Sequence, residues 1–482
     1  MSDSHPATTR PHSICALSMG EWQDHGRQQR TLVLMARKKT PTNAVHIPTQ
    51  RIRVPEVFNL RNATIFGGAK LWTDFLAHIH FPNRLRAVFA ECAKPAQSRY
   101  SLDDVVMVLV TGRAFGLSRI RDFQHIEHDP LLASLFDLPK LPDITSLYRE
   151  LARFGRDRVA AALASIGKQV VSLSIGKEVV LDIDSTVETV YGHQEGAAVG
   201  YNPTKRGRAS FHPQLCFDGL TRTVIDAELR PGNTASSSGL TETVARVIDD
   251  TLKDTVVRLV RGDRGYGNED FMSFLEGRNI PYILKTSATR PLRAWSDTLT
   301  YRMIGEVPNG VLEIASGIYS EALAWSKPRR VVVLRERHTG MPKGLFPMDA
   351  ISDERFIVTT EDWDEEDVFH SYNHRCTVET TIRTLKDDWA LDAFSSRSFA
   401  ANVSDMQFKV MAYNLLLIMQ ALVAPKDRSV VHTAATLRRM WFLLPAVMSS
   451  HAGHWQLRLP MYAETGPYAR ARQALRVLSS SA

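Results

Sequence analysis

The stretch Glu178-Val179-Val180-Leu181-Asp182-Ile183-Asp184 decides the fold class of this chain of 482 residues. Its branched aliphatic side chains predict a β-strand, because such side chains fit a pleated, enclosed surface. The strand ends in acidic residues, and reactive groups of open α/β sheets gather at strand ends. The stretch therefore predicts an α/β core with functional groups at the end of this strand.

Outward from this strand, the downstream sequence alternates between strand and helix patterns. Two more strands follow directly, and three consecutive strands imply a meander. A helix, a strand, a helix and a strand come next, which predicts a mixed sheet. The strands are expected at 213–217, 223–229, 256–261 and 281–285, and the helices at 239–252 and 268–278.

Residues 288–365 return to strand-like patches, at 311–314, 330–334 and 356–358. Asp263 and Glu379 are 116 positions apart, far more than a strand, a helix and two loops require. The excess predicts a separate β-rich subdomain inserted after the fifth strand of the core. Helical periodicity then resumes at 367–390 and 406–424.

The segments before and after the core complete the predicted domain organisation. Apolar residues at helical spacing predict a helical domain over 58–172, in which Asp143 or Thr145 caps a helix. Residues 1–57 are expected to be unstructured, as a basic arm on DNA or as an extension ahead of a true start at Met35. The remaining predicted parts are 173–287 and 366–425 for the core and 426–482 for a C-terminal region with a short hairpin within 440–460.

Composition limits the partners and the compartment. The chain has 59 Lys and Arg against 52 Asp and Glu, and this excess favours a polyanionic partner. Its four cysteines never form a CxxC pair, so we expect neither disulfides nor a cysteine zinc site, and a reducing cytoplasm. The apolar stretch 411–425 is short for a membrane span, and no secretory signal or phosphate-binding GxxxxGK[ST] loop occurs. We therefore expect no membrane and no nucleotide.

Three acidic residues are expected to meet at the edge of the sheet. Asp184 ends the first strand, Asp263 follows the fourth strand in RGDRGY, and Glu379 lies on the helix after the insertion. Carboxylate oxygens suit Mg²⁺ or Mn²⁺, and two such ions about 3.5–4 Å apart support phosphodiester chemistry. This predicts a two-metal nuclease or strand transferase. Taken singly, either aspartate can simply cap a turn, and Asp182 shares the strand face of Asp184.

The helix that carries Glu379 strengthens this hypothesis. On a continuous helix, Tyr372, Arg375, Glu379 and Lys386 fall within a stripe about 60° wide, at about 100° per residue. An acid flanked by a hydroxyl, a guanidinium and an ammonium suits a metal ligand surrounded by phosphate-binding groups. The alternative is a solvent-facing helix with ordinary ion pairs between neighbouring turns.

These four residues match the Y-(2)-R-(3)-E-(6)-K signature, and the sequence resembles bacterial DDE transposases of the insertion sequence 4 superfamily. The segments LDIDST, HQEGA, RPGNT and RGDRGY are similar to the insertion sequence 1380 group. The resemblance spans residues 60–460. It implies an RNase H-like catalytic core with a β-rich insertion, and a divalent metal, Mg²⁺ or Mn²⁺, as two ions. It also implies double-stranded DNA as partner, both element ends and target, and a homodimer on that DNA.

The resemblance also assigns roles. It implies that Asp184, Asp263 and Glu379 are the catalytic, metal-binding acids, and its acid, small residue, Thr pattern favours Asp184 over Asp182. Residues that bind phosphates near the scissile bond in relatives match Tyr372, Arg375 and Lys386. The helices of 58–172 are then expected to bind the DNA ends.

Weaker candidates lie outside this signature. The basic loop that joins the first two strands suits backbone phosphates, although such loops are often only solvated. Asn233 is a candidate for orienting the site, with a turn-forming role as the alternative. Relatives stack aromatic residues of the insertion on an unpaired base, which makes Trp295 and Trp325 candidate wedges, although core packing is favoured for both. The loop's basic residues are Lys205, Arg206 and Arg208.

Three functions compete at this point. The favoured one is a transposase that cuts and joins DNA in the bacterial cytoplasm, at the nucleoid when bound. The second is a domesticated or inactive copy that binds inverted repeats as a regulator, and the intact acids disfavour it. The third is a metal-dependent nuclease that cuts but never joins, and an assay of joined products separates it from the first.

Overall fold

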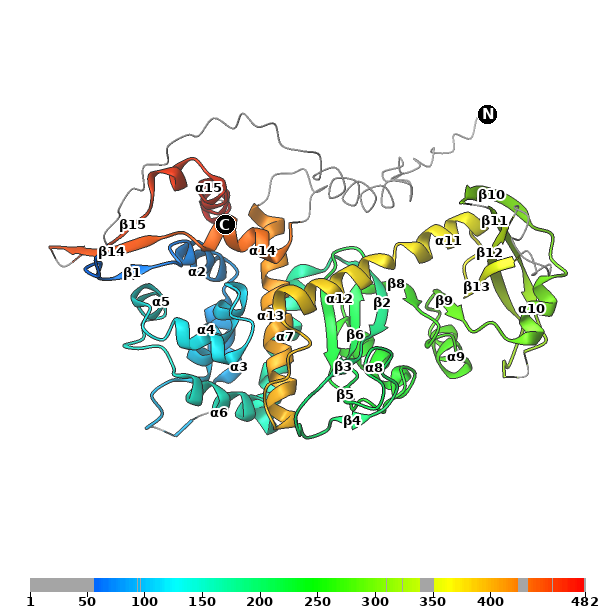
Figure 1. The fold of residues 1–482 in the computed structure, drawn as a ribbon, viewed down its shortest axis with the longest axis horizontal. Coiled ribbons are helices and arrows are strands. Elements are labelled where there is room, and N and C mark those ends of the chain that lie inside the picture. The colour runs from blue at the N-terminus through cyan, green and yellow to red at the C-terminus, as the bar shows by residue number, and fades with distance from the viewer. Residues whose placement is uncertain are drawn as a thin grey trace, which may run out of the picture. The chain divides into compact units, whose positions relative to one another are not determined.

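The computed structural model describes residues 56–92, 94–95, 97–308, 310–322, 324–338, 351–423, 432–452 and 454–480. Leu60–Ala482 form one compact unit, drawn as a ribbon in Figure 1. The predicted arm, residues 1–57, lies outside the described residues except for its last two positions, so its two interpretations stay open.

Five strands form the centre of the main sheet. β2 runs antiparallel to β6 and parallel to β8, while β6 is antiparallel to β7 and β8 is parallel to β9. A three-stranded meander followed by two parallel strands confirms the predicted mixed sheet and the RNase H-like core. In spatial order the strands are β7 (Val224–Glu228), β6 (Gln214–Asp218), β2 (Glu178–Ser185), β8 (Val256–Gly262) and β9 (Tyr282–Thr286).

The central strand β2 is enclosed because helices pack against it. Val179, Leu181 and Ile183 are fully buried in a cluster that also contains residues from the crossover helices. Parallel neighbours need such crossovers, since a short turn cannot return the chain to the same end of the sheet. The crossovers are α8 (Leu240–Arg246), which continues as a π-helical turn (Val247–Thr251), and α9 (Glu269–Gly277).

Residues 288–365 contain the predicted strands, but these strands extend the core sheet instead of forming a separate one. β13 pairs with the outer edge of β9, and the whole sheet has nine strands. The pairing satisfies backbone groups that an open edge of β9 would expose. The predicted β-rich insertion after the fifth strand is thus confirmed, although its strands continue the core sheet, and its division into a separate domain stays a prediction. After the short helix α10 (Arg290–Ser296) the strands are β10 (Arg302–Val307), β11 (Gly310–Tyr319), β12 (Arg329–His338) and β13 (Ile351–Thr359).

The opposite edge of the sheet, β7, is covered by the long helix α13 (Phe399–Val423). The Asn414 side chain accepts a hydrogen bond from the Val224 N–H (3.0 Å) and donates to its carbonyl (2.8 Å). Gln407 donates to the Ala227 carbonyl (2.7 Å). Two polar side chains thus satisfy edge groups that an apolar helix would leave unpaired.

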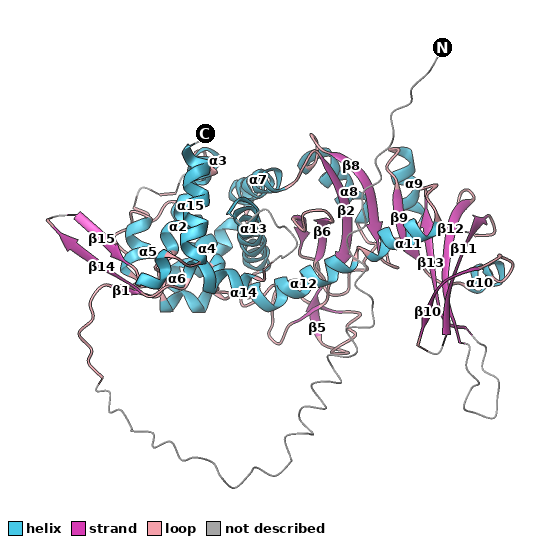
Figure 2. Ribbon diagram, turned by 90° about the horizontal axis from the view of Figure 1, so that it is seen from above, coloured by secondary structure: helices cyan, strands magenta, loops and turns pink. Residues whose placement is uncertain are grey.

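α13 also forms the centre of the helical region. Figures 1 and 2 both place it between the N-terminal helices and the sheet. Among the described residues it alone is long and apolar enough to cross a membrane, but 78% of its apolar window is buried inside the protein, as in a core helix. The surrounding helices are α2 (Ala69–His78), α3 (Phe81–Phe89), α4 (Leu102–Ala114), α5 (Pro130–Leu135), α6 (Ile144–Phe154) and α7 (Asp157–Ser174), with a 3₁₀ turn at Ile120–His125.

Two predicted local features of the outer regions are present. Asp143, one of the two expected caps, accepts a hydrogen bond from the Ser146 N–H (2.9 Å) and begins α6. The C-terminal hairpin consists of β14 (Ala446–His451) and β15 (His454–Arg458), and β1 (Ala63–Thr64) joins it as a third strand. The other C-terminal elements are α14 (Ala434–Leu437), a π turn (Arg438–Phe442), a 3₁₀ turn (Met461–Glu464) and α15 (Pro467–Ser480).

The connection between β2 and β6 forms a small sheet of its own, which the sequence did not predict. Its strands have two or three residues each, too few to show a period. They are β3 (Glu188–Thr189), β5 (Ala209–Phe211) and β4 (Ala198–Val199), in that spatial order.

Candidate active site

Asp182 and Asp184 share β2 but have different environments. Both carboxylate oxygens of Asp182 are bound by Arg261, with distances of 2.6 Å to Nε and 2.7 Å to Nη2, and Asp182 is fully buried. Asp184 keeps a side chain that is 19% exposed, accepts a hydrogen bond from the Ser185 N–H (2.8 Å) and pairs with Arg375 (2.9 Å). Asp182 therefore has a structural role as the partner of Arg261, whereas Asp184 reaches the edge of the sheet.

Asp263 directly follows β8 at the same edge. The Tyr372 hydroxyl donates to its Oδ1 (2.9 Å), and the Lys285 ammonium lies 3.5 Å from that oxygen. Burial opposes the charged form of Asp263, but Arg375, the Arg264 backbone N–H and Lys285 outweigh it and lower its pKa. Asp263 is therefore held as a carboxylate by groups from three different elements.

Glu379 lies on α12 (Cys376–Trp389) with an exposed side chain. Burial raises the pKa of Asp184, which Arg375 opposes, and the negative charges of Asp263 and Glu379 raise it further. Asp263 and Glu379 thus lie within electrostatic reach of Asp184, and carboxylate oxygens are the donors that Mg²⁺ and Mn²⁺ prefer. Their mutual repulsion is what a divalent cation would relieve, so the donor set fits such an ion.

The donors are near one another without forming a compact group. Among the residues that the structure describes, no three His, Cys, Asp or Glu side chains are close enough together to hold a metal ion. Arg375 and Tyr372 contact oxygens of Asp184 and Asp263 instead. A pair of metal ions at these three acids stays a prediction.

The predicted continuous helical stripe is wrong. α11 (Glu365–Asn373) ends before Arg375, and α12 begins after it. The break arises because the N–H groups of Arg375 and Val378 bond to carbonyls three residues back, at Tyr372 (3.0 Å) and Arg375 (2.9 Å), which is 3₁₀ geometry. Tyr372 and Arg375 nevertheless reach Asp263 and Asp184 from this junction.

Lys386 has a partner that the sequence did not reveal. Its ammonium lies 2.8 Å from Glu188 Oε1, on β3, and the Glu188 side chain is 4% exposed against 29% for Lys386. Burial raises the pKa of Glu188, which Lys386 opposes. In this structure the predicted DNA-contacting ammonium is therefore neutralised by a buried carboxylate 198 positions earlier in the chain.

Because Glu188 is buried, we expect Lys386→Met to lower the free energy of unfolding by about 2 kcal/mol, since it leaves a carboxylate without its cation. The double variant Glu188→Gln, Lys386→Met removes both charges and should recover most of that loss. Urea unfolding of the DNA-free protein measures both values. An unchanged unfolding midpoint in the single variant would mean that the ion pair contributes nothing to stability.

His212 is a site residue that sequence reasoning missed. It is buried, with Nδ1 2.7 Å from the Thr234 carbonyl and Nε2 3.0 Å from Ser185 Oγ. Burial lowers its pKa, so the ring is neutral, and because a carbonyl only accepts, Nδ1 carries the proton. His212 thus holds Ser185, whose backbone N–H binds Asp184. Its position just before the predicted second strand gave no sign of this role.

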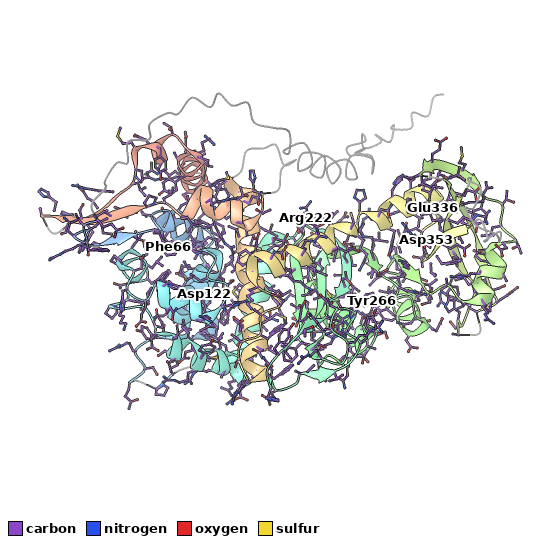
Figure 3. All side chains as sticks on the ribbon, viewed as in Figure 1. Phe66, Asp122, Arg222, Tyr266, Glu336 and Asp353 are labelled. Atoms are coloured by element: carbon purple, nitrogen blue, oxygen red, sulfur yellow. The ribbon has the colours of Figure 1, made fainter. Side chains whose placement is uncertain are left out.

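The turn after Asp263 carries a buried tyrosine. Tyr266, labelled in Figure 3, is 2% exposed, and its N–H bonds to the Asp263 carbonyl (2.9 Å). Burial and the charge of Asp184 raise the pKa of Tyr266. Tyr266 therefore lies near both Asp184 at the end of β2 and Asp263 after β8.

The weaker candidates divide into exposed and packed residues. Asn233 is exposed in the turn between Pro231 and Thr234. Trp295 and Trp325 are partly buried against Tyr319, with ring centroids 5.1 and 5.6 Å away, which agrees with the packing alternative, while base stacking by either ring stays a prediction. Lys205, Arg206 and Arg208 are exposed in the loop between β4 and β5.

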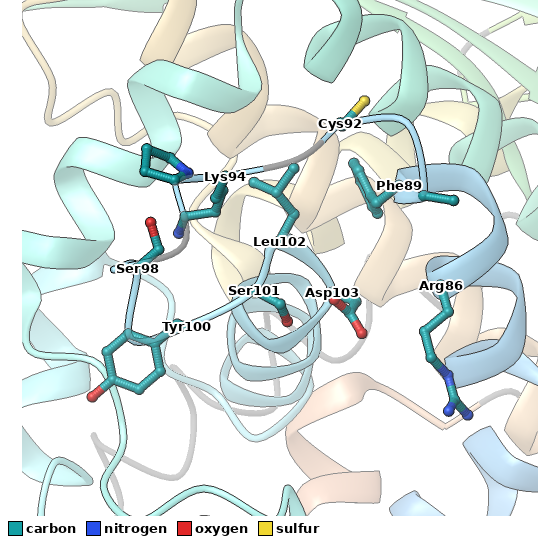
Figure 4. A pocket seen from close by; sticks show the side chains of 11 residues that line it. Arg86, Phe89, Cys92, Lys94, Ser98, Tyr100, Ser101, Leu102 and Asp103 are labelled. Atoms are coloured by element: carbon teal, nitrogen blue, oxygen red, sulfur yellow. The ribbon is translucent and has the colours of Figure 1, made fainter.

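The acids line an open edge and not an enclosed cavity. The Asp263 side chain is 43% exposed, and Glu379 is exposed. The pocket in Figure 4 lies between α3 and the start of α4, with Arg86 and Lys94 among its lining, and it contains none of the candidate residues. An open edge suits an extended polymer better than a small molecule, which binds in a concave pocket.

The strand order and the acids at the carboxyl edge of the sheet define an RNase H-like α/β protein with a candidate active site. A family model described as transposase DDE domain group 1 matches residues 50–480, so the chain belongs to that family of transposases. No curated protein matches the chain.

Among solved structures, the chain is similar to the piggyBac transposase in a synaptic complex with hairpin DNA, at 11% identity and a TM-score of 0.41. The match covers 87% of this chain and 84% of that chain. A likeness of this size transfers neither residues nor chemistry.

Proposed function

We propose that the protein is a bacterial transposase of the insertion sequence 4 superfamily, similar to the insertion sequence 1380 group. It binds the terminal inverted repeats of its element, cuts the DNA at the ends and joins them to target DNA in the cytoplasm. The observation that carries the proposal is the meeting of Asp184 and Asp263, with Arg375 between them, at the carboxyl edge of an RNase H-like sheet. Family membership supports the transposase class.

The roles follow from the environment of each side chain. Asp184, Asp263 and Glu379 hold Mg²⁺ or Mn²⁺, as two ions, which when bound supply the charge that activates a nucleophile and stabilises a leaving oxygen. Arg375 is a bidentate phosphate donor beside Asp184, and Tyr372 fixes the carboxylate of Asp263. Lys285, which the signature does not contain, adds a cation at the same edge.

DNA is the partner in this proposal, with the protein acting as a homodimer on it. The helices of 58–172 bind the element ends, and the net charge of +7 supports a polyanionic partner. A regulator that never cuts is the second candidate, but the ionised Asp263 beside Tyr372 and Lys285 favours a working site over a decayed one.

The decisive experiment uses duplexes taken from the DNA on both sides of the gene, ending in its inverted repeats. With Mg²⁺ or Mn²⁺ we expect cuts at the repeat ends and products joined to a target plasmid, and sequencing across the junctions identifies both. Cut ends without any joined product would reduce the function to that of a nuclease. Binding of the repeats with neither product would favour the regulator.

A further inference from the structure

Next to the candidate active site, the small sheet and its loops carry exposed aromatic and basic side chains. We call residues 188–211, from β3 to β5, the flap (Figure 1). Tyr191 is 74% exposed and Tyr201 is 80% exposed. The basic residues of the flap loop are also exposed, and within the described part of the chain none of them pairs with an acidic side chain. They are Lys205, Arg206 and Arg208.

The flap loop has a defined base although its tips face solvent. The Asn202 side chain, which is buried, donates to Thr189 Oγ1 (2.8 Å) and accepts from the N–H groups of Lys205 (2.9 Å) and Thr204 (3.2 Å). Gly207 has a φ of +74°, which a residue with a side chain rarely adopts, and it turns the chain back toward β5. The cations are therefore presented from a fixed turn.

Aromatic and basic side chains of the flap are also close to each other. The Arg208 guanidinium carbon lies 6.0 Å from the ring centroid of Tyr191, within the range of a cation–π contact. Gly200, which precedes Tyr201, packs so tightly on the turn at Gly232 that a Cβ there would lie 2.0 Å from the Gly232 carbonyl oxygen. Tyr201 thus projects from a backbone that is held in place, and Tyr191 lies beside a loop cation.

One ion pair and two chain connections join the flap to the candidate active site. Glu188, at its start, binds Lys386 of α12, and β3 begins four residues after Asp184. At its end, β5 leads into His212, which holds Ser185. A DNA strand bound on the flap would therefore lie close to the acids.

Cations alone suit any nucleic-acid backbone, but exposed aromatic rings favour bases that are not stacked in a duplex. Every base has a face that can stack on tyrosine, and in double-stranded DNA those faces are covered by neighbouring bases. We propose that the flap binds unpaired DNA beside the candidate active site, with Tyr191 and Tyr201 stacking on bases and the loop cations binding phosphates. This rests on the proposed function, in which the acids beside the flap cut and join DNA.

The test measures binding of a labelled 20-nucleotide single strand of mixed sequence and of the matching blunt duplex by the full chain, without divalent metal so that no cutting occurs. Tyr191→Ala and Tyr201→Ala should each weaken single-strand binding about tenfold and change duplex binding less than about twofold. Tyr→Phe at either position keeps the ring and should bind as the wild type does. Tyr462→Ala is the matched control, since Tyr462 is 62% exposed outside the flap.

The contribution of the basic flap residues is measured by the salt dependence of binding. Replacing Lys205, Arg206 and Arg208 together with Ala should lower the slope of log affinity against log salt by about 2, at about 0.7 per phosphate contact on a single strand. An equal loss on duplex and single strand in the tyrosine variants would overturn the proposal in favour of a duplex surface. No loss on either would mean that the tyrosines are only solvated.

Failure of this proposal can be distinguished from failure of the proposed function. Normal metal-dependent cutting and joining, with single-strand binding unaffected by the tyrosine variants, rejects the flap alone. Single-strand binding that depends on both tyrosines, in a wild-type protein that never cuts the repeat ends, rejects the transposase activity alone.

Discussion

Asp263→Asn should reduce metal-dependent cutting of the element ends to below about a thousandth of the wild-type rate, while binding of those ends changes little. The substitution keeps the size of the side chain and its hydrogen bond from Tyr372. It removes the negative charge of the carboxylate, which Arg375, Arg264 and Lys285 stabilise. Binding persists because phosphate contacts over the whole interface dominate affinity. Single-turnover cleavage and anisotropy on the same duplex measure the two quantities.

Asp184→Asn and Glu379→Gln should have the same effect, because the proposed metal site needs all three acids. Glu366→Gln is the matched control, since Glu366 is a partly exposed acid on α11 that pairs with Arg302. Near-normal cutting by Asp263→Asn would remove Asp263 from the site. Mn²⁺ titration by electron paramagnetic resonance gives an independent readout, with tight binding expected in the wild type and lost in the Asn variants.

The succession of strands and helices along the core could be predicted because each element depends on a local pattern. β2, β6, β7, β8 and β9 are short branched or aromatic runs separated by turn residues, and chain order then limits the possible sheets. The docking of β13 onto β9 could not be predicted, since residues 283–286 pair with residues 356–359, which lie 70 to 76 positions later in the chain. Nothing local distinguishes a strand that extends a sheet from one that begins another.

The sequence predicted which acids lie near Asp184, but not the contacts that these side chains make. Asp263 and Glu379 were found from their positions after a strand and on a helix, with the resemblance adding their roles. The Lys386–Glu188 pair and the His212–Ser185 contact join residues distant in sequence, so no spacing rule reveals them. The break at Arg375 was missed because an argument from periodicity assumes ideal α-helical geometry. No residue type in this segment indicates that its hydrogen bonds run to the carbonyl three residues back.

Asp182→Ala should have the largest effect on stability, lowering the free energy of unfolding by about 3–5 kcal/mol. The Arg261 side chain is 6% exposed, and two of its N–H groups bind only Asp182, so the change leaves a buried guanidinium without its counter-charge. Asp184→Asn, by contrast, keeps an oxygen that can accept from Arg375 and removes a charge that burial and two neighbouring acids disfavour. Its free energy of unfolding should stay within about 1 kcal/mol of the wild-type value.

The pair of variants decides which aspartate of β2 performs the chemistry. Urea unfolding should show a large loss for Asp182→Ala and little for Asp184→Asn, while cleavage below the unfolding midpoint should be lost only in Asp184→Asn. The double variant Asp182→Leu, Arg261→Met removes both buried charges and should recover much of the stability, because it leaves no unpaired ion. A stable Asp182→Ala protein that cannot cut, beside an Asp184→Asn protein that cuts, would transfer the catalytic role to Asp182. The physical reason for expecting the opposite is that Asp182 is fully buried and both of its oxygens are bound by a buried arginine, whereas Asp184 is partly exposed at the edge of the sheet.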